Sequence, residues 1–236
     1  MGLTRYGRRE WLGGGIVALA VAALGGGLWL AGIPEAGIPI AAFSVVAWTA
    51  LAAFFRDPRR LPPPDADLLV SPADGRVRDI ELITDPEVTA WFGGGNAVRV
   101  GIFLSVLDVH LNRAPCDLTV RERVARTGVF HDARDEHAIT ENEAVTIIGE
   151  GRGPAGTMSV AVRQISGAIA RRIVCAAGPG TELKRGERYG MIKFGSRTEL
   201  YVPAAADVVI LVRVGDRVYG GKTPMARWPV QRGGGA

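Results

Sequence analysis

The sequence predicts a mainly β protein, a compact β sandwich or barrel, preceded by a two-helix membrane hairpin. Two long apolar runs without charge lie near the N-terminus, and the rest of the chain consists of short apolar or alternating segments. The 236 residues include 32 Gly and 14 Pro with few aromatic residues, a composition typical of a chain with many turns. We therefore expect a membrane anchor over residues 1–60 and a β domain over residues 61–236.

The anchor is predicted from residues 12–33 and 38–55, which carry no charged side chain. A helix needs about 20 apolar residues to cross the hydrocarbon core of a bilayer. Residues 34–37 separate the two runs and are expected to form the turn. Arginines flank the pair on both outer sides, so the positive-inside rule places both ends, and the β domain, on the cytoplasmic side of the cell membrane. A shallow interfacial anchor is the alternative.

Strands are predicted where apolar residues run together or alternate with polar ones. Residues 98–104 and 208–212 are nearly all apolar and indicate buried strands, whereas residues 118–121 and 158–163 alternate. A returning strand is expected at residues 217–219. Helical periodicity is weak in this half of the chain. The short helix that we expect covers residues 85–92, with Asp85 as its N-cap and Pro86 at its first helical position.

Two stretches, residues 184–190 and 213–220, resemble each other in having a Gly followed by an acidic residue between strand-like segments. Two similar hairpins explain this pattern. Turns of this kind also occur in lipoyl-type modules, so a membrane-tethered lipoyl-like carrier or binding module is an alternative function. Such a carrier needs a modified lysine at a hairpin tip, and Lys184 and Lys222 are poorly placed for that role.

The net charge and the cysteines indicate which ligands and covalent links the chain is expected to have. The net charge of +4 is too small to indicate nucleic acid as a partner. No Cys/His spacing typical of a metal site is present, so we expect no metal. Cys116 and Cys175 are isolated from each other in the sequence and are predicted to be free, buried thiols, as in a reducing compartment.

The Gly195-Ser196 peptide bond is the main candidate for chemistry. In a tight bend, a Ser hydroxyl can attack the carbonyl of a preceding Gly, which has no side chain to block it. The resulting ester can eliminate to release Gly195 as a new C-terminus, and the dehydroalanine left at Ser196 hydrolyses to a pyruvoyl group. A plain surface turn is the other interpretation. A serine hydrolase is disfavoured because no Gly-x-Ser-x-Gly elbow surrounds Ser196.

Other titratable residues are candidates for acid–base work. His110 ends an apolar stretch two residues after Asp108, and a His beside a buried carboxylate is a ready general acid or base near neutral pH. Asp74 lies in a Pro-Ala-Asp-Gly stretch, which has two interpretations: a plain turn, or an acid placed to orient a His on another strand. His131 and His137 lie in a charged stretch that indicates an exposed, non-catalytic loop.

Six stretches taken in order resemble one family, the phosphatidylserine decarboxylase proenzymes of the short prokaryotic type. They are residues 55–58, 71–75, 103–115, 141–143, 167–172 and 190–196. The short archaetidylserine decarboxylases have the same pattern and are an alternative. The resemblance implies a lyase that converts phosphatidylserine in the bilayer to phosphatidylethanolamine. It also implies that the cofactor is a pyruvoyl group derived from Ser196.

The resemblance further implies cleavage into a long chain (1–195) and a short chain (196–236) that stay associated, with further oligomers possible. It assigns Ser196, His110 and Asp74 to catalysis or self-cleavage. Compared with the longer enzymes of the family, this chain has Arg113 in place of a second His and Arg197 in place of Ser or Thr. A basic residue should meet the phosphate or carboxylate of the lipid, and the candidates close in sequence are Lys193, Arg113 and Arg197.

Overall fold

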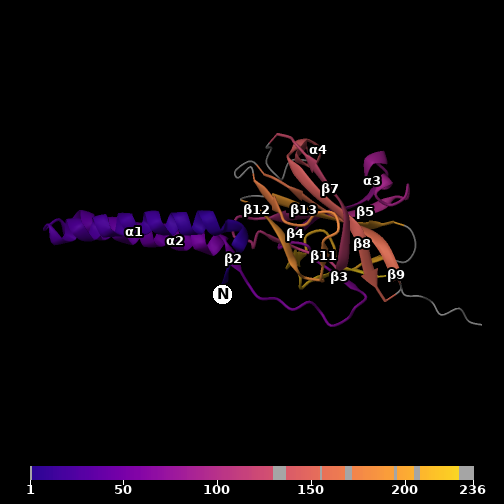
Figure 1. Cartoon of the computed structure of the whole chain (residues 1–236), viewed down its shortest axis with the longest axis horizontal. Coiled ribbons are helices and arrows are strands. Elements are labelled where there is room, and N and C mark those ends of the chain that lie inside the picture. Colours follow the sequence, from indigo (N-terminus) through magenta and orange to yellow (C-terminus); the bar gives the residue numbers. More distant parts are fainter. Residues whose placement is uncertain are drawn as a thin grey trace, which may run out of the picture. The chain divides into compact units, whose positions relative to one another are not determined.

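The computed structural model describes residues 2–129, 137–154, 156–167, 172–193, 196–204 and 208–228, with His137 and Ala138 described by their backbone alone. The chain divides into two compact units, Met1–Arg59 and Arg60–Ala236 (Figure 1). Each unit is built mainly from contacts within itself, and each is described separately below.

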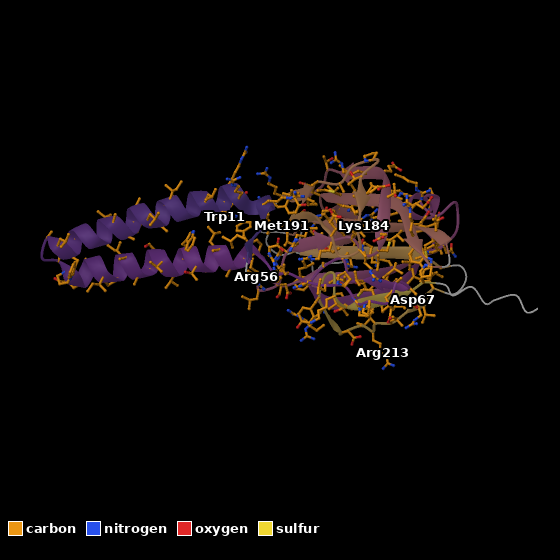
Figure 2. The ribbon with its side chains drawn as sticks, turned by 60° about the horizontal axis from the view of Figure 1, so that its bottom comes forward. Trp11, Arg56, Asp67, Lys184, Met191 and Arg213 are labelled. Atoms are coloured by element: carbon orange, nitrogen blue, oxygen red, sulfur yellow. The ribbon has the colours of Figure 1, made fainter. Side chains whose placement is uncertain are left out.

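The first unit is a helical hairpin. Its elements are β1 (Gly2–Leu3), a 3-10 turn η1 (Arg5–Gly7), α1 (Arg8–Leu30), α2 (Pro34–Phe54) and β2 (Arg56–Asp57). Both α-helices are long and apolar enough to cross a membrane. Their side chains are drawn almost entirely as carbon in Figure 2, where Trp11 marks one of them. The predicted two-helix hairpin is confirmed.

The turn of the hairpin differs from the prediction. Residues 34–37 are the first turn of α2, because Pro34 at the first helical position loses no intrahelical hydrogen bond. The chain reverses just before, where Gly32 has a φ of 86° that favours glycine. Gly25 and Gly37 let the two helices approach closely: a β-carbon at Gly37 would lie 2.4 Å from the Gly25 carbonyl oxygen.

The second unit is mainly β, as predicted. Its first half comprises β3 (Leu68–Val70), β4 (Gly75–Ile83), α3 (Pro86–Ala90), β5 (Ala97–Leu104), β6 (Leu111–Arg113), β7 (Asp117–Arg126), α4 (His137–Glu141) and β8 (Ala144–Gly153). Its second half comprises β9 (Gly156–Ile165), β10 (Ile173–Cys175), β11 (Glu182–Leu183), β12 (Arg188–Ile192), β13 (Ser196–Pro203), β14 (Val209–Ile210), β15 (Arg217–Val218) and β16 (Pro224–Arg227).

These strands form one large sheet and two small ones. The large sheet has eight strands in the order β11-β7-β8-β9-β13-β5-β4-β15, and the small sheets are β10-β12-β6 and β14-β16-β3. The main core joins the large sheet to the strands of the small sheets; it includes Val100, Ile102, Leu200, Val202, Leu69, Tyr189, Met225 and Trp228. A second, smaller cluster lies between α3 and the sheet and includes Val88, Ala161 and Tyr201.

Most predicted strands and the predicted helix are present. Asp85 caps α3 as expected, since its Oδ1 accepts hydrogen bonds from the Glu87 and Val88 amides at 2.9 and 3.3 Å. The prediction of a buried strand at residues 208–212 is wrong. Only Val209–Ile210 forms a strand, in a small sheet, and Val209 is 53% exposed. Its neighbours Ile210 and Val212 face the core, so this segment alternates rather than being buried on both faces.

The two Gly-acid stretches are two similar turns. Gly186 and Gly215 have φ values of 80° and 97°. In the first turn the Lys184 amide donates to the Glu187 carboxylate at 2.9 Å, and in the second the Arg213 amide donates to the Asp216 carboxylate at 2.8 Å. In both, the acidic side chain closes the turn over the backbone amide three residues earlier.

Both cysteines are free, as predicted, but only Cys116 is buried: Cys175, at the end of the short strand β10, is half-buried. Burial raises the pKa of the Cys116 thiol well above its ordinary value, and the neighbouring Asp117 carboxylate adds to the increase. Cys116 is therefore an unreactive thiol in the folded protein.

Candidate active site

Ser196 is the first residue of β13, a central strand of the large sheet that pairs with β5 and with β9. Side chains alternate along a strand, so Ser196 shares its face with Thr198 and with the core residue Leu200. Its side chain is fully buried, and its Oγ has no hydrogen-bond partner among the residues that the structure describes. The preceding Gly195 lies outside the described residues.

His110 is a fully buried residue just before β6. Its Nδ1 lies 2.9 Å from the Asp108 carbonyl oxygen. A carbonyl oxygen only accepts hydrogen bonds, so Nδ1 carries a proton, and Nε2 is the nitrogen that is unprotonated whenever the ring is neutral. This tautomer is the one that a general base acting through Nε2 requires.

The Asp108 carboxylate is held by groups other than the ring of His110. It accepts hydrogen bonds from the Ser105 amide and hydroxyl, both at 2.8 Å, and it pairs with Arg217. The chain turns at residues 105–108 instead of continuing as a strand, so strand alternation does not place the side chains of Asp108 and His110 on one face.

A polar ladder joins β6 to the face of β13 that carries Ser196. The Asn112 Nδ2 donates to Thr198 Oγ1 at 2.9 Å, and the Gln164 Nε2 donates to Asn112 Oδ1 at 2.8 Å. Gln164 is the register partner of Thr198 on β9. His110 precedes Asn112 by two residues and Ser196 precedes Thr198 by two, so the ladder brings the segments carrying the two candidate catalytic residues into one buried layer.

Sequence reasoning missed Asn112, Gln164 and Thr198 as parts of this layer. Gln164 could have been found from the sequence. It occupies a core-facing position of an alternating strand whose other core-facing residues are apolar, and its side chain is a polar amide. A buried amide at such a position needs partners, and those partners mark a polar site inside the core.

Asp74 is buried, but its carboxylate is held by groups other than His110. It forms a two-fold pair with the Arg60 guanidinium, in which Nη2 lies 2.7 Å from Oδ2, and it accepts the Gly220 amide at 2.8 Å. Arg60 also donates to the Gly220 carbonyl at 2.8 Å. These contacts tie Asp74 to the turn before Gly221, and they do not support the expectation that Asp74 orients a histidine.

Arg197 is clamped inside the sheet, on the face opposite to Ser196. Its Nε donates to Glu199 at 2.8 Å, and its two terminal nitrogens each lie 2.7 Å from an oxygen of Asp79. Asp79 is the register partner of Gly101, which is in turn the partner of Glu199, so the guanidinium lies across β5. A β-carbon at Gly101 would lie 2.1 Å from Arg197 Nη2, so glycine at this position makes room for the clamp.

The charges of this cluster stabilise one another. Burial by itself raises the pKa of Asp79, but the hydrogen bond and charge of Arg197, together with Arg99, outweigh it and hold that pKa below its ordinary value. Burial by itself lowers the pKa of Arg197, but Glu199 and Asp79 raise it above its ordinary value. The Arg197 guanidinium is neutralised within the sheet and its side chain is 4% exposed, which argues against the predicted contact with a lipid head group.

The two other predicted head-group residues are also buried. Arg113 donates from Nη1 to the Gly186 carbonyl at 3.0 Å and so supports the first Gly-acid turn. Lys193 is 6% exposed and lies three residues before Ser196. Of the remaining histidines, His131 lies outside the described residues and His137 begins α4.

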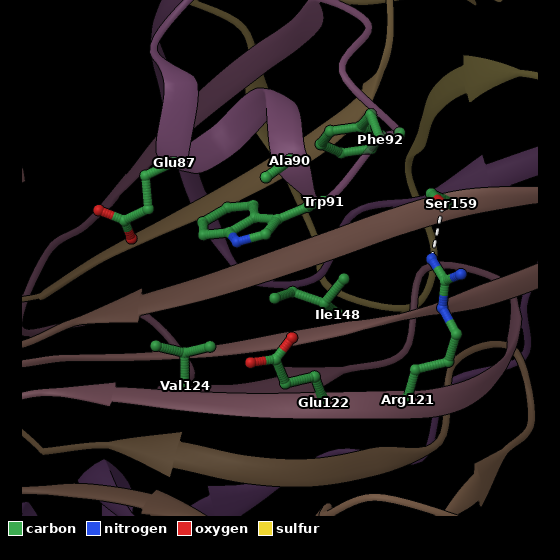
Figure 3. A pocket seen from close by; sticks show the side chains of 10 residues that line it. Glu87, Ala90, Trp91, Phe92, Arg121, Glu122, Val124, Ile148 and Ser159 are labelled. Atoms are coloured by element: carbon green, nitrogen blue, oxygen red, sulfur yellow. Dashed lines mark hydrogen bonds between the residues drawn. The ribbon is translucent and has the colours of Figure 1, made fainter.

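A cleft of about 1050 Å³ lies elsewhere on the second unit (Figure 3). Trp91 and Glu87 line it from the α3 side, and Ile148 and Arg121 line it from the sheet. Ile148 belongs to the small hydrophobic cluster that contains Tyr201. Tyr201 lies on the face of β13 opposite to the face that carries Ser196. The cleft is therefore separated from the Ser196 side chain by the sheet.

Comparisons with known proteins show the family of this chain. The sequence pattern of the phosphatidylserine decarboxylase family matches residues 49–226. A phosphatidylserine decarboxylase proenzyme from Trichlorobacter lovleyi is 40% identical over 217 residues, 92% of this chain and 88% of the relative. One from Nitratidesulfovibrio vulgaris is 46% identical over 175 residues, 74% of this chain and 76% of the relative. A putative archaetidylserine decarboxylase proenzyme from Methanopyrus kandleri is 42% identical over 181 residues, 75% of this chain and 81% of the relative. The chain belongs to the phosphatidylserine decarboxylase family, and it is a decarboxylase.

Proposed function

We propose that this protein converts phosphatidylserine to phosphatidylethanolamine with a pyruvoyl group that it makes by cleaving itself between Gly195 and Ser196. The observation that carries the proposal is the buried Ser196 hydroxyl, which has no hydrogen-bond partner among the described residues. Leaving a buried polar group unsatisfied costs about 1–3 kcal/mol, so such a group is expected where it has a chemical task. The word proenzyme in the names of the relatives fits a chain that must be processed.

The residues around Ser196 fit a pyruvoyl group. The side chain lies in a buried layer beside the segment of His110, where a carbonyl is protected from bulk water. When present, the pyruvoyl carbonyl supplies the electron sink that loss of CO2 from an amino acid requires. We assign His110 Nε2 to proton transfer, because the bond from Nδ1 to Asp108 leaves that nitrogen as the basic one.

After cleavage, the short chain would stay bound without a covalent link. It begins with β13, which is hydrogen-bonded along both edges to β5 and β9 of the long chain. Its β16 also pairs with β3. Separation would expose the core face of β13 and break both ladders, and this favours a stable two-chain protein. We assign Asp74 a positioning role, since it and Arg60 hold the Gly220 turn of the short chain.

The clamp on Arg197 should matter for self-cleavage, because it fixes the residue next to the attacking serine. Gly101→Ala places a β-carbon on the guanidinium, and Arg197→Lys removes the two-fold contact with Asp79. We expect either change to slow cleavage by about 10–100-fold, since misplacing a reacting group by about 1 Å can have effects of that size. The fraction cleaved can be followed with time on a denaturing gel after cell-free synthesis.

Gly178→Ala is the matched control for Gly101→Ala, because a β-carbon at Gly178 meets nothing within 4 Å. It should cleave at the wild-type rate. Circular dichroism of each variant separates slow cleavage from failure to fold. Wild-type cleavage rates in folded Arg197→Lys and Gly101→Ala would contradict the positioning role.

We propose that the hairpin spans the cell membrane and leaves the β unit on the cytoplasmic side. The support is the length and apolar character of α1 and α2 together with the arginines on either side of the pair. Reporter fusions before Gly2 and after Arg60 should both indicate the cytoplasm. A reporter inserted at Gly32 should indicate the opposite side, whereas an interfacial anchor would leave it in the cytoplasm. A non-cytoplasmic signal after Arg60 would overturn the orientation.

Archaetidylserine is the alternative substrate, because one relative is named as a putative archaetidylserine decarboxylase proenzyme. The serine head group, at which the decarboxylation takes place, is common to both lipids. Assays with the two lipids in matched vesicles decide between them by the ratio of kcat/KM values.

A further inference from the structure

The turn between β5 and β6, residues 105–108, presents apolar side chains to solvent. The Asp108 amide donates to the Ser105 carbonyl at 2.8 Å, and the Ser105 amide and hydroxyl both donate to the Asp108 carboxylate at 2.8 Å. The two residues at the tip are Val106, 50% exposed, and Leu107, 83% exposed. Gly, Pro, Asn, Asp and Ser dominate such positions, so two large apolar residues on a firmly fixed turn call for an explanation.

This turn lies directly beside the candidate active site. It follows Leu104, the register partner of Ser196 across β5 and β13. It precedes His110 by two residues. The exposed tip is therefore at the same end of the large sheet as Ser196 and is part of the segment that positions His110.

Cationic and amphipathic side chains flank the tip. The Asp108 carboxylate pairs with Arg217, whose side chain is 40% exposed and whose guanidinium lies 5.7 Å from the Tyr219 ring centre. Tyr219 is itself 44% exposed. In the strand register, Arg217 of β15 lies opposite Arg76 of β4, and Arg76 lies opposite Phe103 at the end of β5. Exposed guanidinium groups from β15 and β4 thus lie at the end of the sheet from which the apolar tip projects.

An apolar tip with arginines and a tyrosine at its base matches the chemistry of an anionic phospholipid surface. Apolar side chains enter the acyl boundary, arginines meet phosphate, and tyrosine prefers the interface between them. A soluble partner is less favoured, because the same chain carries two helices able to cross a bilayer and so keeps this unit near one.

We propose that Val106, Leu107, Arg76, Arg217 and Tyr219 form a membrane-contact surface that docks the active site onto a bilayer containing anionic phospholipid. This inference rests on the proposed function for its purpose, which is to let a lipid head group reach Ser196 without leaving the membrane. The contact of the tip with the bilayer does not itself depend on that function and can be tested separately.

The first test measures contact without using activity. Full-length protein carrying Leu107→Cys is labelled with an environment-sensitive fluorophore and placed in vesicles of phosphatidylcholine and phosphatidylglycerol. We expect a blue-shifted emission that is quenched by spin-labelled lipid. Wild-type protein serves as the labelling blank and measures any reaction of the two native thiols: Cys116 is buried, and Cys175 is half-buried with a pKa that burial raises.

Leu82→Cys is the matched control. Leu82 is also an exposed leucine, at 60%, but it pairs with Val98 at the opposite end of the sheet from the pair formed by Leu104 and Ser196. Its label should remain unquenched. Equal quenching at both positions, or none at Leu107, would overturn the proposal. A blue shift of the Leu107 label in detergent that grows with protein concentration would instead indicate a contact between two copies.

The second test uses kinetics. A double variant, Val106→Ser with Leu107→Ser, should raise the KM for phosphatidylserine in vesicles. We expect this fold-increase to be about tenfold larger than the fold-increase in the KM for a short-chain, monomeric phosphatidylserine. Equal changes with both substrates would count against membrane docking. If the wild-type protein decarboxylates neither substrate, the proposed function fails, while the labelling experiment still decides whether the tip contacts the bilayer.

Discussion

Ser196→Ala should give a single uncleaved chain with no decarboxylase activity. The substitution removes the only oxygen that can attack the Gly195 carbonyl in the proposed reaction, and it leaves the apolar surroundings of β13 intact. The wild-type protein should instead consist of two chains, residues 1–195 and 196–236. Intact mass distinguishes the two outcomes directly, and Edman sequencing should find the short chain blocked by its pyruvoyl group.

Two further variants sharpen this experiment. Ser196→Cys keeps a nucleophile and should retain slow cleavage. Ser159→Ala, on the neighbouring strand β9, removes a hydroxyl that accepts from Arg121 and should cleave normally. Borohydride added with substrate should link the substrate amine to the short wild-type chain and leave Ser196→Ala unlabelled. An active, full-length wild-type chain with an unmodified Ser196 would refute the proposed mechanism.

His110→Ala should lower phosphatidylethanolamine formation by about 10²–10⁴-fold, the usual range for loss of a general acid or base. The ring is fully buried, and the Asp108 carbonyl fixes its tautomer, so neither water nor a neighbouring side chain replaces it without rearrangement. The measurement requires two readouts, the extent of self-cleavage and the turnover rate of the cleaved fraction.

The two readouts separate the roles of His110. A cleaved variant with slow turnover places His110 in decarboxylation, and an uncleaved variant places it in maturation. Normal cleavage followed by normal turnover would show that the assignment is wrong. His137→Ala provides the control, because the sequence places His137 in a charged stretch and the structure places it at the start of α4.

Local patterns in the sequence were sufficient to predict much of the fold. The apolar runs predicted both helices of the hairpin, and the Asp85-Pro86 pair predicted the start of α3. The Gly-acid stretches predicted two turns that share the same hydrogen bond. These features depend on interactions between residues a few positions apart, so the local sequence is enough to predict them.

The candidate site was only partly predictable, because its geometry depends on contacts between distant segments. Arg197 was one of three candidates for the lipid head group, and in the structure it meets Asp79, 118 positions away, after a bulge in β4 and across a glycine in β5. For Asp74 the sequence offered a plain turn or a role in orienting a histidine, and the partner that the structure gives it, the Gly220 amide, lies 146 positions later in the chain.

The sequence by itself determined the family, the two apolar helices and the positions of most strands, since each is encoded in an ordered set of short motifs or in local periodicity. Only the tertiary structure decided which face of the sheet Ser196 occupies and which charges neutralise Arg197 and Asp74. A shift of one residue in strand register would move Ser196 to the other face. That register is set by packing and hydrogen bonds among β4, β5, β9 and β13, which no single segment contains.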